Sequence, residues 1–236
     1  MADPVAREGH SVLRPVRPWT GSVHALLAHL RGHGVTWVPE PRGVDARGRA
    51  AVSWLPGEVP AYPMPDHLWA PEVLQRAGAM LRELHDATAG FRREGRTWML
   101  PAREPAEVIC HNDFAPYNLV FRDGLPVAAI DFEAAAPGPR SWDLAYLAYR
   151  LVPLAAPGNP DLPTQHDPEG RLAALCAAYG GVAPGDVLAL VPDRLIALAE
   201  AAPPAHAERY RADAAYVSAA SSELFGLSPN NSEMGA

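Results

Sequence analysis

Residues 108–121 read VICHNDFAPYNLVF and place a histidine, an aspartate and an asparagine between two runs that are typical of β-strands. The next segment, residues 118–133, reads NLVFRDGLPVAAIDFE and predicts a hairpin, because two apolar runs flank an Asp-Gly pair. A hairpin brings its two ends together, so Asp131 is expected to return to the loop that carries Asp113 and Asn118.

This meeting point predicts a chemical site. The carboxylate of Asp131 and the amide oxygen of Asn118 are hard ligands of the kind that Mg²⁺ binds. Asp113 is then free to accept a proton from a nucleophile, and a metal beside a base is what phosphoryl transfer requires. Each residue alone would serve equally well to cap a turn. The joint His-x-Asp-x-x-x-x-Asn spacing, with the hairpin and Ile-Asp-Phe after it, favours the chemical interpretation.

The surrounding pattern predicts a small, β-containing N-terminal part and a larger helical C-terminal part. The stretch WTGSVHALLAHLRGHG reads as a helix that Ser22 or Thr20 caps and Gly34 ends. A short strand, SVLRP, precedes it, and residues 1–10 look disordered. The Pro-rich stretch LPGEVPAYPMP marks the internal boundary. Two further strands are expected near 35–44 and 50–54, and further helices at 71–88, 141–151, 171–179, 184–200 and 205–224, with Pro192 kinking or dividing the fourth of these helices.

Composition favours an ordinary globular protein and limits its partners. The chain has 236 residues, 48% hydrophobic and 20% charged, with a net charge of −7 and no lysine among its 20 basic residues. Without a basic stripe, nucleic acid is not an expected partner. The N-terminus has no apolar segment of a secretory signal, and no apolar run reaches the roughly 18 residues that span a bilayer. We therefore expect a cytoplasmic protein with no membrane partner.

The two cysteines are too few and too far apart for a disulfide framework or a zinc site. Cys176 shares a helical face with apolar residues, which favours a core position. Cys110 stands beside His111, which suggests a thiol nucleophile, but it also ends an apolar strand, and we favour a buried, inert thiol.

The residues quoted above carry a resemblance to a known family. HNDFAPYNLVF followed by AIDFEAAAPGPRSWDLAY is similar to the catalytic loop and metal-binding segment of the aminoglycoside phosphotransferases, relatives of the protein kinases. The resemblance is specific over residues 108–150. It extends more weakly to VHALLAHLRGHGVTWVPEPRGVDARGRAAVSWLPGE, which resembles that family's αC helix, following strands and hinge. It implies an α+β, two-lobed protein-kinase-like fold, with a small antiparallel-sheet N-lobe, a larger helical C-lobe, and ATP and Mg²⁺ between them.

The resemblance also implies roles for single residues. Asp113 matches the general base that accepts the proton of the substrate hydroxyl, and His111 matches the histidine that braces the loop. Asn118 and Asp131 match the Mg²⁺ ligands that hold the phosphates of ATP. Asp143, in SWDLA, matches a structural aspartate that supports the catalytic loop, although a plain helix N-terminal charge explains it equally well.

The hinge is carried by SWLPGE, in which Ser53, Trp54 and Leu55 resemble the segment whose backbone pairs with adenine; an ordinary apolar strand end is the alternative. The pattern departs from the family before this point. The sequence has no clear glycine-rich hairpin over the phosphates, and the strand lysine is missing because the chain has none. Arg14 is the candidate substitute, or else a solvated arginine beside a proline. The expected αC helix lacks its glutamate, and His24 is the nearest polar candidate.

Two functions follow from this mixture. The first is an ATP- and Mg²⁺-dependent O-phosphotransferase that acts on a small hydroxyl-bearing molecule. The second is a catalytically impaired pseudoenzyme of the same fold that binds a ligand or a protein partner. We expect a shortened N-lobe over 11–58, a C-lobe over 59–226, and disordered tails at 1–10 and 227–236.

The acceptor, the choice between ATP and GTP, the oligomeric state and any role in antibiotic resistance are not determined by the sequence. Acidic residues of the C-terminal helices would suit a cationic acceptor, or they form solvated helix faces. These residues are Asp186, Asp193, Glu200, Glu208 and Asp213.

Overall fold

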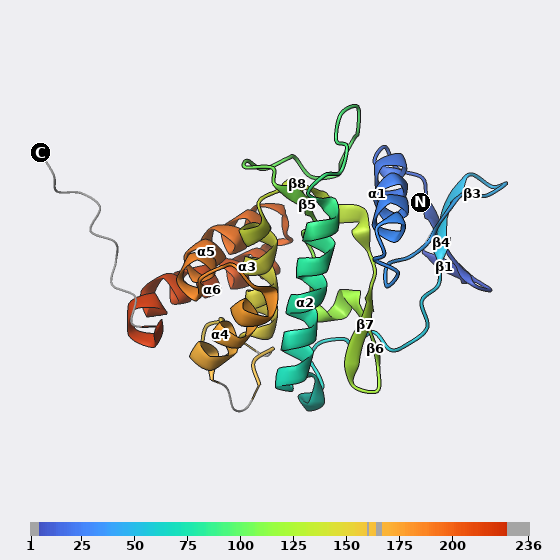
Figure 1. Ribbon diagram of the computed structural model, residues 1–236. Coiled ribbons are helices and arrows are strands. Elements are labelled where there is room, and N and C mark those ends of the chain that lie inside the picture. Colours follow the sequence, from blue (N-terminus) through green and yellow to red (C-terminus); the bar gives the residue numbers. More distant parts are fainter. Residues whose placement is uncertain (1–4, 160, 164–166, 226–236) are drawn as a thin grey trace, which may run out of the picture.

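The computed structural model describes residues 5–159, 161–163 and 167–225. Within them the chain forms a small N-lobe with a four-stranded sheet and a larger, mostly helical C-lobe (Figure 1). This is the α+β, two-lobed architecture that the sequence predicts. The tail expected over 227–236 lies outside the described residues.

The N-lobe sheet is antiparallel, with the strand order β1-β2-β4-β3. Leu13 and Ala51 pair with each other and are buried on one face of the sheet, and Ala50, next to Ala51 in β4, is buried on the other face. The first strand lies where a disordered tail was expected, and that expectation is wrong here because Ala6 pairs with Leu13 across the sheet. The strands are β1 (Ala6–Glu8), β2 (Ser11–Pro15), β3 (Pro41–Val44) and β4 (Arg49–Ser53).

Helix α1 (Thr20–Gly32) covers this sheet through the predicted apolar face. The predicted cap is wrong, because no side chain caps the helix, and the Thr20 hydroxyl instead accepts a hydrogen bond from the Arg17 N–H at 2.8 Å. The face consists of Val23, Leu26, Leu27 and Leu30, all buried.

The linker between the lobes is fastened to the C-lobe hairpin. Glu58 and Phe121 exchange two backbone hydrogen bonds of 2.9 and 2.7 Å. Gly57 beside them has φ +145°, and a Cβ there would lie 2.4 Å from Val120 Cγ1 and 2.6 Å from the Phe121 carbonyl oxygen. A glycine is therefore required where the linker crosses the hairpin.

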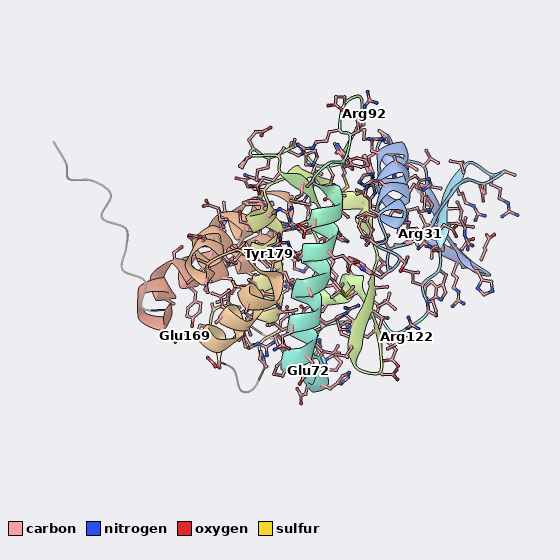
Figure 2. The ribbon with its side chains drawn as sticks, in the orientation of Figure 1. Arg31, Glu72, Arg92, Arg122, Glu169 and Tyr179 are labelled. Carbon is pink, nitrogen blue, oxygen red and sulfur yellow. The ribbon has the colours of Figure 1, made fainter. Side chains whose placement is uncertain are left out.

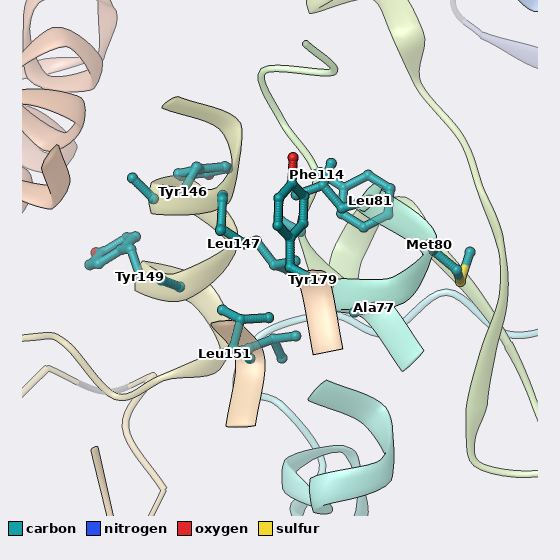
Figure 3. Close-up of a cluster of buried hydrophobic side chains, with 14 of the residues drawn as sticks. Ala77, Met80, Leu81, Phe114, Tyr146, Leu147, Tyr149, Leu151 and Tyr179 are labelled. Carbon is teal, nitrogen blue, oxygen red and sulfur yellow. The ribbon is translucent and has the colours of Figure 1, made fainter. Parts of the chain in front are cut away.

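The C-lobe is built around α2, which runs through the middle of the molecule (Figure 1). Leu147 and Leu151 point from α3 toward α2 and Tyr179, whereas Tyr146 and Tyr149 point to the other side of α3 (Figure 3). Exposed charges such as Glu72, Arg92, Arg122 and Glu169 lie on the outside (Figure 2). The five helices are α2 (Pro71–Thr88), α3 (Arg140–Leu151), α4 (Pro168–Tyr179), α5 (Pro184–Ala201) and α6 (Pro204–Phe225).

All five predicted helices are present, and α2 has the predicted ends because Pro71 occupies the first turn. Of the two predicted effects of Pro192, the division is wrong, because Pro192 lies inside a continuous α5; the kink stays a prediction. Among the described residues, no single helix is long and apolar enough to cross a membrane, although α4 and α5 together meet that test of length and composition with a bend of 103° between them.

Two short pairs of strands position the polar segment 108–121. The predicted hairpin is formed by β6 (Leu119–Arg122) and β7 (Leu125–Ala129). The second pair joins β5 (Val108–Cys110) to β8 (Ala136–Gly138), and no sequence pattern predicted it.

The cysteines are structural. Cys110 is fully buried and its thiol donates to the Pro139 carbonyl at 3.3 Å. Burial raises the pKa of Cys110 well above its usual value and that of Cys176 to about 11. Both thiols are therefore protonated near neutral pH, which confirms the prediction of buried, inert cysteines.

Candidate active site

The loop between β5 and β6, residues 111–118, carries the predicted base on a rigid support. His111 is 1% exposed, and its Nε2 lies 3.0 Å from the Ile130 carbonyl. Its Nδ1 accepts the Asp113 N–H at 3.3 Å, so Nε2 is the nitrogen that donates. His111 thereby links the loop to the end of the β6–β7 hairpin.

Asp113 has protein donors on both carboxylate oxygens. The Tyr117 hydroxyl donates to Oδ1 at 2.5 Å, and Asn118 Nδ2 donates to Oδ2 at 2.7 Å and to the Asp113 carbonyl at 2.9 Å. Tyr117 also shares a 2.6 Å hydroxyl contact with Tyr146 of α3. Asp113 is partly exposed, so the fixed carboxylate is still open to a molecule from outside.

The hairpin returns Asp131 to Asn118, as the sequence predicts. Leu119 pairs with Ala129, and the Ile130 N–H donates to the Asn118 carbonyl at 2.9 Å. Asp131 follows at once, with φ 62° in the left-handed region, where aspartate is one of the few tolerated residues. This turn ends the strand and directs the chain into the short 3₁₀ helix Phe132–Ala134.

Arg14 from the N-lobe strand β2 lies on this carboxylate. Its Nη1 is 2.9 Å from Asp131 Oδ1 and 3.2 Å from Glu133 Oε1. Burial acts to lower the pKa of Arg14, but the two carboxylates outweigh it and leave that pKa above its ordinary value. Arg14 is therefore not a solvated arginine: it joins the two lobes at the predicted metal site.

Helix α1 adds two groups to the same place. Trp19 Nε1 donates to Glu133 Oε2 at 2.5 Å. His24 lines the same cavity as Arg14 and Glu133, and burial lowers its pKa more than Glu133 raises it. His24 is thus neutral near pH 7, and as a histidine it cannot supply the negative charge of the missing glutamate to Arg14.

A cavity of about 300 Å³ lies between the lobes at this point. Its walls are mostly apolar, with valines from both lobes, while Arg14, Asn118, Asp131 and Glu133 form a polar end. Every predicted nucleotide-binding or metal-binding residue lines it: Arg14, Ser53, Trp54, Leu55, Asn118 and Asp131. An apolar cleft with a few convergent polar groups is typical of a small-molecule site.

The hinge offers fewer hydrogen bonds than its sequence suggests. The Ser53 N–H donates to the Glu40 carbonyl at 2.8 Å, and the Trp54 N–H donates to the His10 carbonyl at 2.9 Å. These two donors are committed to the sheet. Among the described residues, the Leu55 N–H has no backbone partner, so it is the donor left for a ligand at this edge.

Asp143 supports the catalytic loop from below, as the resemblance implied. It is fully buried and accepts the N–H groups of His111 and Asn112 at 2.6 and 2.8 Å, with His85 Nε2 at 3.2 Å. Burial raises its pKa, but these hydrogen bonds and the two histidines outweigh that effect and leave the pKa below its ordinary value. His85 of α2 is part of this support and also contacts the Tyr179 hydroxyl at 2.7 Å.

Arg194 of α5 is a further support that no sequence pattern indicated. Its Nη2 donates to the Asn112 carbonyl at 2.5 Å, and its guanidinium lies 4.6 Å from the centre of the Tyr146 ring. Asn112 has φ 62°, and its side-chain amide donates to the Ala134 carbonyl at 3.0 Å. The left-handed turn before Asp113 is thus held from three directions.

Comparison with known proteins agrees with this geometry. The model of the phosphotransferase enzyme family (APH) matches residues 20–107 and 96–184. The chain belongs to this family. The match includes α1, the hinge, the catalytic loop, Asp131 and the Asp143 support, which are the parts that form the cleft.

One curated protein related in sequence is the trifolitoxin immunity protein of Rhizobium leguminosarum bv. trifolii. It is 40% identical over 148 residues, which are 60% of this chain and 55% of that protein. The matched part thus spans about half the length of the relative.

Three solved structures share the fold. An amicoumacin kinase, hAmiN, in complex with AMP-PNP, Ca²⁺ and Ami is 14% identical with a TM-score of 0.63, and the match covers 89% of this chain and 87% of that one. A choline/ethanolamine kinase family protein from Mesorhizobium loti is 21% identical with a TM-score of 0.56, and the match covers 90% and 84% of the two chains. An aminoglycoside phosphotransferase from Alicyclobacillus acidocaldarius is 16% identical with a TM-score of 0.57, and the match covers 94% and 91%. At these identities they show the kinase-like fold alone.

Proposed function

We propose that this phosphotransferase uses ATP and Mg²⁺ to phosphorylate a hydroxyl group of a small molecule. The observation that supports the proposal most is the convergence of Asn118 and Asp131 at the polar end of the interlobe cavity, with the Asp113 carboxylate hydrogen-bonded to Asn118 beside it. A binding protein would need no fixed, accessible carboxylate beside a pair of metal ligands. A phosphotransferase needs both.

The residues present fit a magnesium ion. Asn118 commits its nitrogen to Asp113, which leaves the amide oxygen for a cation, and Asp131 keeps one oxygen away from Arg14, with its side chain 47% exposed. One amide and one carboxylate oxygen suit Mg²⁺, which usually completes its shell with phosphate and water. Bound there, Mg²⁺ would neutralise phosphate charge and hold the phosphates for in-line transfer.

The residues also fit a nucleotide. The apolar walls would take the base and ribose, with Ser53, Trp54 and Leu55 along the hinge edge and the Leu55 N–H as hydrogen-bond donor. Arg14 would serve in place of the missing lysine, since its guanidinium reaches the polar end from the N-lobe. Its planar fork suits two oxygens of a phosphate at once.

The chemical step then falls to Asp113. It accepts the proton of the acceptor hydroxyl, the hydroxyl oxygen bonds to the γ-phosphorus, and the bond from that phosphorus to the bridging oxygen breaks to release ADP. Tyr117 and Asn118 hold the carboxylate in one orientation, and His111, Asp143 and Arg194 hold the loop. Positioning of this kind supplies much of the rate in phosphoryl transfer.

One observation favours the second function, a ligand-binding pseudoenzyme. Arg14 already neutralises Asp131 and Glu133, and in this arrangement the carboxylate has less attraction for a cation. A protective role would be compatible with either function, since the trifolitoxin immunity protein bears that name.

The two functions separate in one experiment. The protein is incubated with ATP, Mg²⁺ and a panel of hydroxyl compounds, and ADP is measured with and without EDTA. Acceptor-dependent ADP that EDTA abolishes supports the phosphotransferase. Nucleotide binding by calorimetry without ADP from any acceptor supports the pseudoenzyme.

A further inference from the structure

Arg150 is a cation that the proposed reaction does not use. It lies in the last turn of α3, next to the tyrosines that support Asp113. Its guanidinium is 4.3 Å from the centre of the Tyr62 ring, 5.3 Å from that of Tyr117 and 5.4 Å from that of Tyr149. Tyr62 belongs to the interlobe linker, and Tyr117 belongs to the catalytic loop. Aromatic rings from three separate elements therefore surround one positive charge.

Among the described residues, Asp161 is the acid that lines the same small space as this charge, and the two side chains are not paired. In the described part of the chain Arg150 forms no ion pair, and its buried Nε has no hydrogen-bond partner. The buried hydroxyl of Tyr62 lies beside the same guanidinium and has no hydrogen bond of good geometry. Two orphaned donors at one place are unusual, because each buried donor without an acceptor costs about 1–3 kcal/mol. A group that only accepts hydrogen bonds would satisfy both.

The carboxylates of this region are committed elsewhere. Asp213 is buried, not solvated as expected, and it accepts hydrogen bonds from Tyr149, the Ala156 N–H and Asn159 at 2.8, 2.8 and 3.0 Å. Asp161 lies 3.7 Å from Arg209. The other four acids proposed for a cationic acceptor are exposed on α5 and α6. The side of the loop that faces Tyr62 and Arg150 thus offers a cation and donors.

The same place is one side chain away from the base. Tyr117 donates its hydroxyl to Asp113 and turns its ring toward Arg150, and all three residues are partly exposed. The enclosed space beside Tyr62, Tyr149 and Arg150 is about 20 Å³, which is room for one water or one carboxylate oxygen. The remainder of a bound molecule would lie on the open surface next to Asp113.

From this juxtaposition we propose that the acceptor is an anionic hydroxyl compound, whose carboxylate pairs with Arg150 and the Tyr62 hydroxyl while its hydroxyl group meets Asp113. The proposal rests on the proposed function. The acidic composition of the chain would favour a positively charged acceptor, whereas this proposal assigns a negatively charged one. The alternative is that Arg150 only braces the linker against α3 through its contacts with the rings.

The test compares acceptors that share a carbon skeleton and differ in charge: glucuronate, glucose and glucosamine, and glycerate, glycerol and 3-amino-1,2-propanediol. ADP formation and calorimetric binding in the presence of AMP-PNP and Mg²⁺ are measured for each. In the wild-type protein the anionic member of a series should be preferred by about tenfold to a hundredfold, as expected for a charge-assisted pair.

Two variants assign the preference to its residues. Arg150→Met keeps the packing of the side chain and should bring the anionic and neutral members within about twofold of each other, while Arg150→Lys should retain part of the preference. Tyr62→Phe removes the orphaned hydroxyl alone and should weaken anion binding by about threefold to tenfold. Thermal unfolding of each variant shows whether it is folded.

Three results overturn the proposal. The first is equal or better use of a neutral or cationic member, which leaves the phosphotransferase function intact. The second is an anion preference that Arg150→Met does not change, and the third is no Arg150-dependent binding of glucuronate or glycerate. Failure of the proposed function looks different, since no compound of any charge would then yield ADP.

Discussion

Because Arg14 forms an ion pair with Asp131, its substitution should change the affinity for metal and the affinity for nucleotide in opposite directions. In the free protein, Arg14 occupies one oxygen of the carboxylate that the proposal assigns to Mg²⁺. When nucleotide binds, the same guanidinium is proposed to move onto the phosphates. Arg14→Met removes the charge and keeps a side chain of similar length, so it should strengthen metal binding and weaken nucleotide binding.

The size of both effects follows from the geometry. Arg14 makes contacts of 2.9 and 3.2 Å with side chains that are 47% and 25% exposed, and such pairs are worth about 0.2–1 kcal/mol each. Their loss should raise the affinity for a divalent cation without nucleotide by roughly twofold to thirtyfold, at about 1.4 kcal/mol per factor of ten. The loss of a charge-assisted phosphate contact should weaken AMP-PNP binding by about tenfold or more.

The assay is a titration with Mn²⁺, followed by its electron paramagnetic resonance signal, and a separate calorimetric titration with AMP-PNP and Mg²⁺. Arg47→Met is the matched control, because Arg47 is an exposed arginine of the same lobe that does not line the cavity. Tighter Mn²⁺ binding together with weaker AMP-PNP binding supports the reasoning. Unchanged or weaker Mn²⁺ binding in Arg14→Met would refute it.

Three other changes test the site and its support. Asp113→Asn should abolish ADP formation and leave AMP-PNP binding within about twofold; turnover that persists rules out the assigned base. Asp143→Ala should lower the free energy of unfolding by about 3–5 kcal/mol, because it leaves the N–H groups of His111 and Asn112 buried and unpaired, and an exposed control such as Asp193→Ala should not. Because the pKa of Asp143 is lowered in the folded protein, its contribution to the free energy of unfolding is complete above about pH 4 and is lost as the pH falls further. Urea denaturation between pH 7 and pH 3 should therefore show a smaller difference in unfolding free energy between Asp143→Ala and the wild type at the lower pH. Gly57→Ala should destabilise the protein by about 1–3 kcal/mol, since its Cβ would collide with Val120 and Phe121, whereas Gly48→Ala, with open space around it, should cost less; equal unfolding midpoints would contradict this.

Local signals explain what could be predicted from the sequence. Helix α2 has the predicted ends because a proline begins it and apolar residues recur at helical spacing. The β6–β7 hairpin follows from Asp123-Gly124 between apolar runs, and its closure fixes Asp131 beside Asn118. These features depend on residues close to one another in the chain.

The remainder depends on contacts between distant segments. The pairing of β5 with β8, the ion pair of Arg14 with Asp131 and the hydrogen bond of Arg194 to Asn112 join residues that have no local pattern in common. Asp213 reads as a solvated helix residue, and only the fold reveals its buried partners. The sequence therefore predicted the residues of the candidate site, with His111 and Asp143 as supports, but not the contacts of Arg14, Arg194 and Asp213.

The central claim is that the interlobe cavity holds a nucleotide through a metal bound by Asn118 and Asp131. The most direct measurement is a calorimetric titration of the wild-type protein and of Asp131→Ala with AMP-PNP, with and without Mg²⁺. We expect the wild type to bind AMP-PNP more tightly with Mg²⁺ than without it, and we expect Mg²⁺ to have little effect on binding by Asp131→Ala. Absence of binding at millimolar AMP-PNP, or the same dependence on Mg²⁺ in Asp131→Ala, would contradict it.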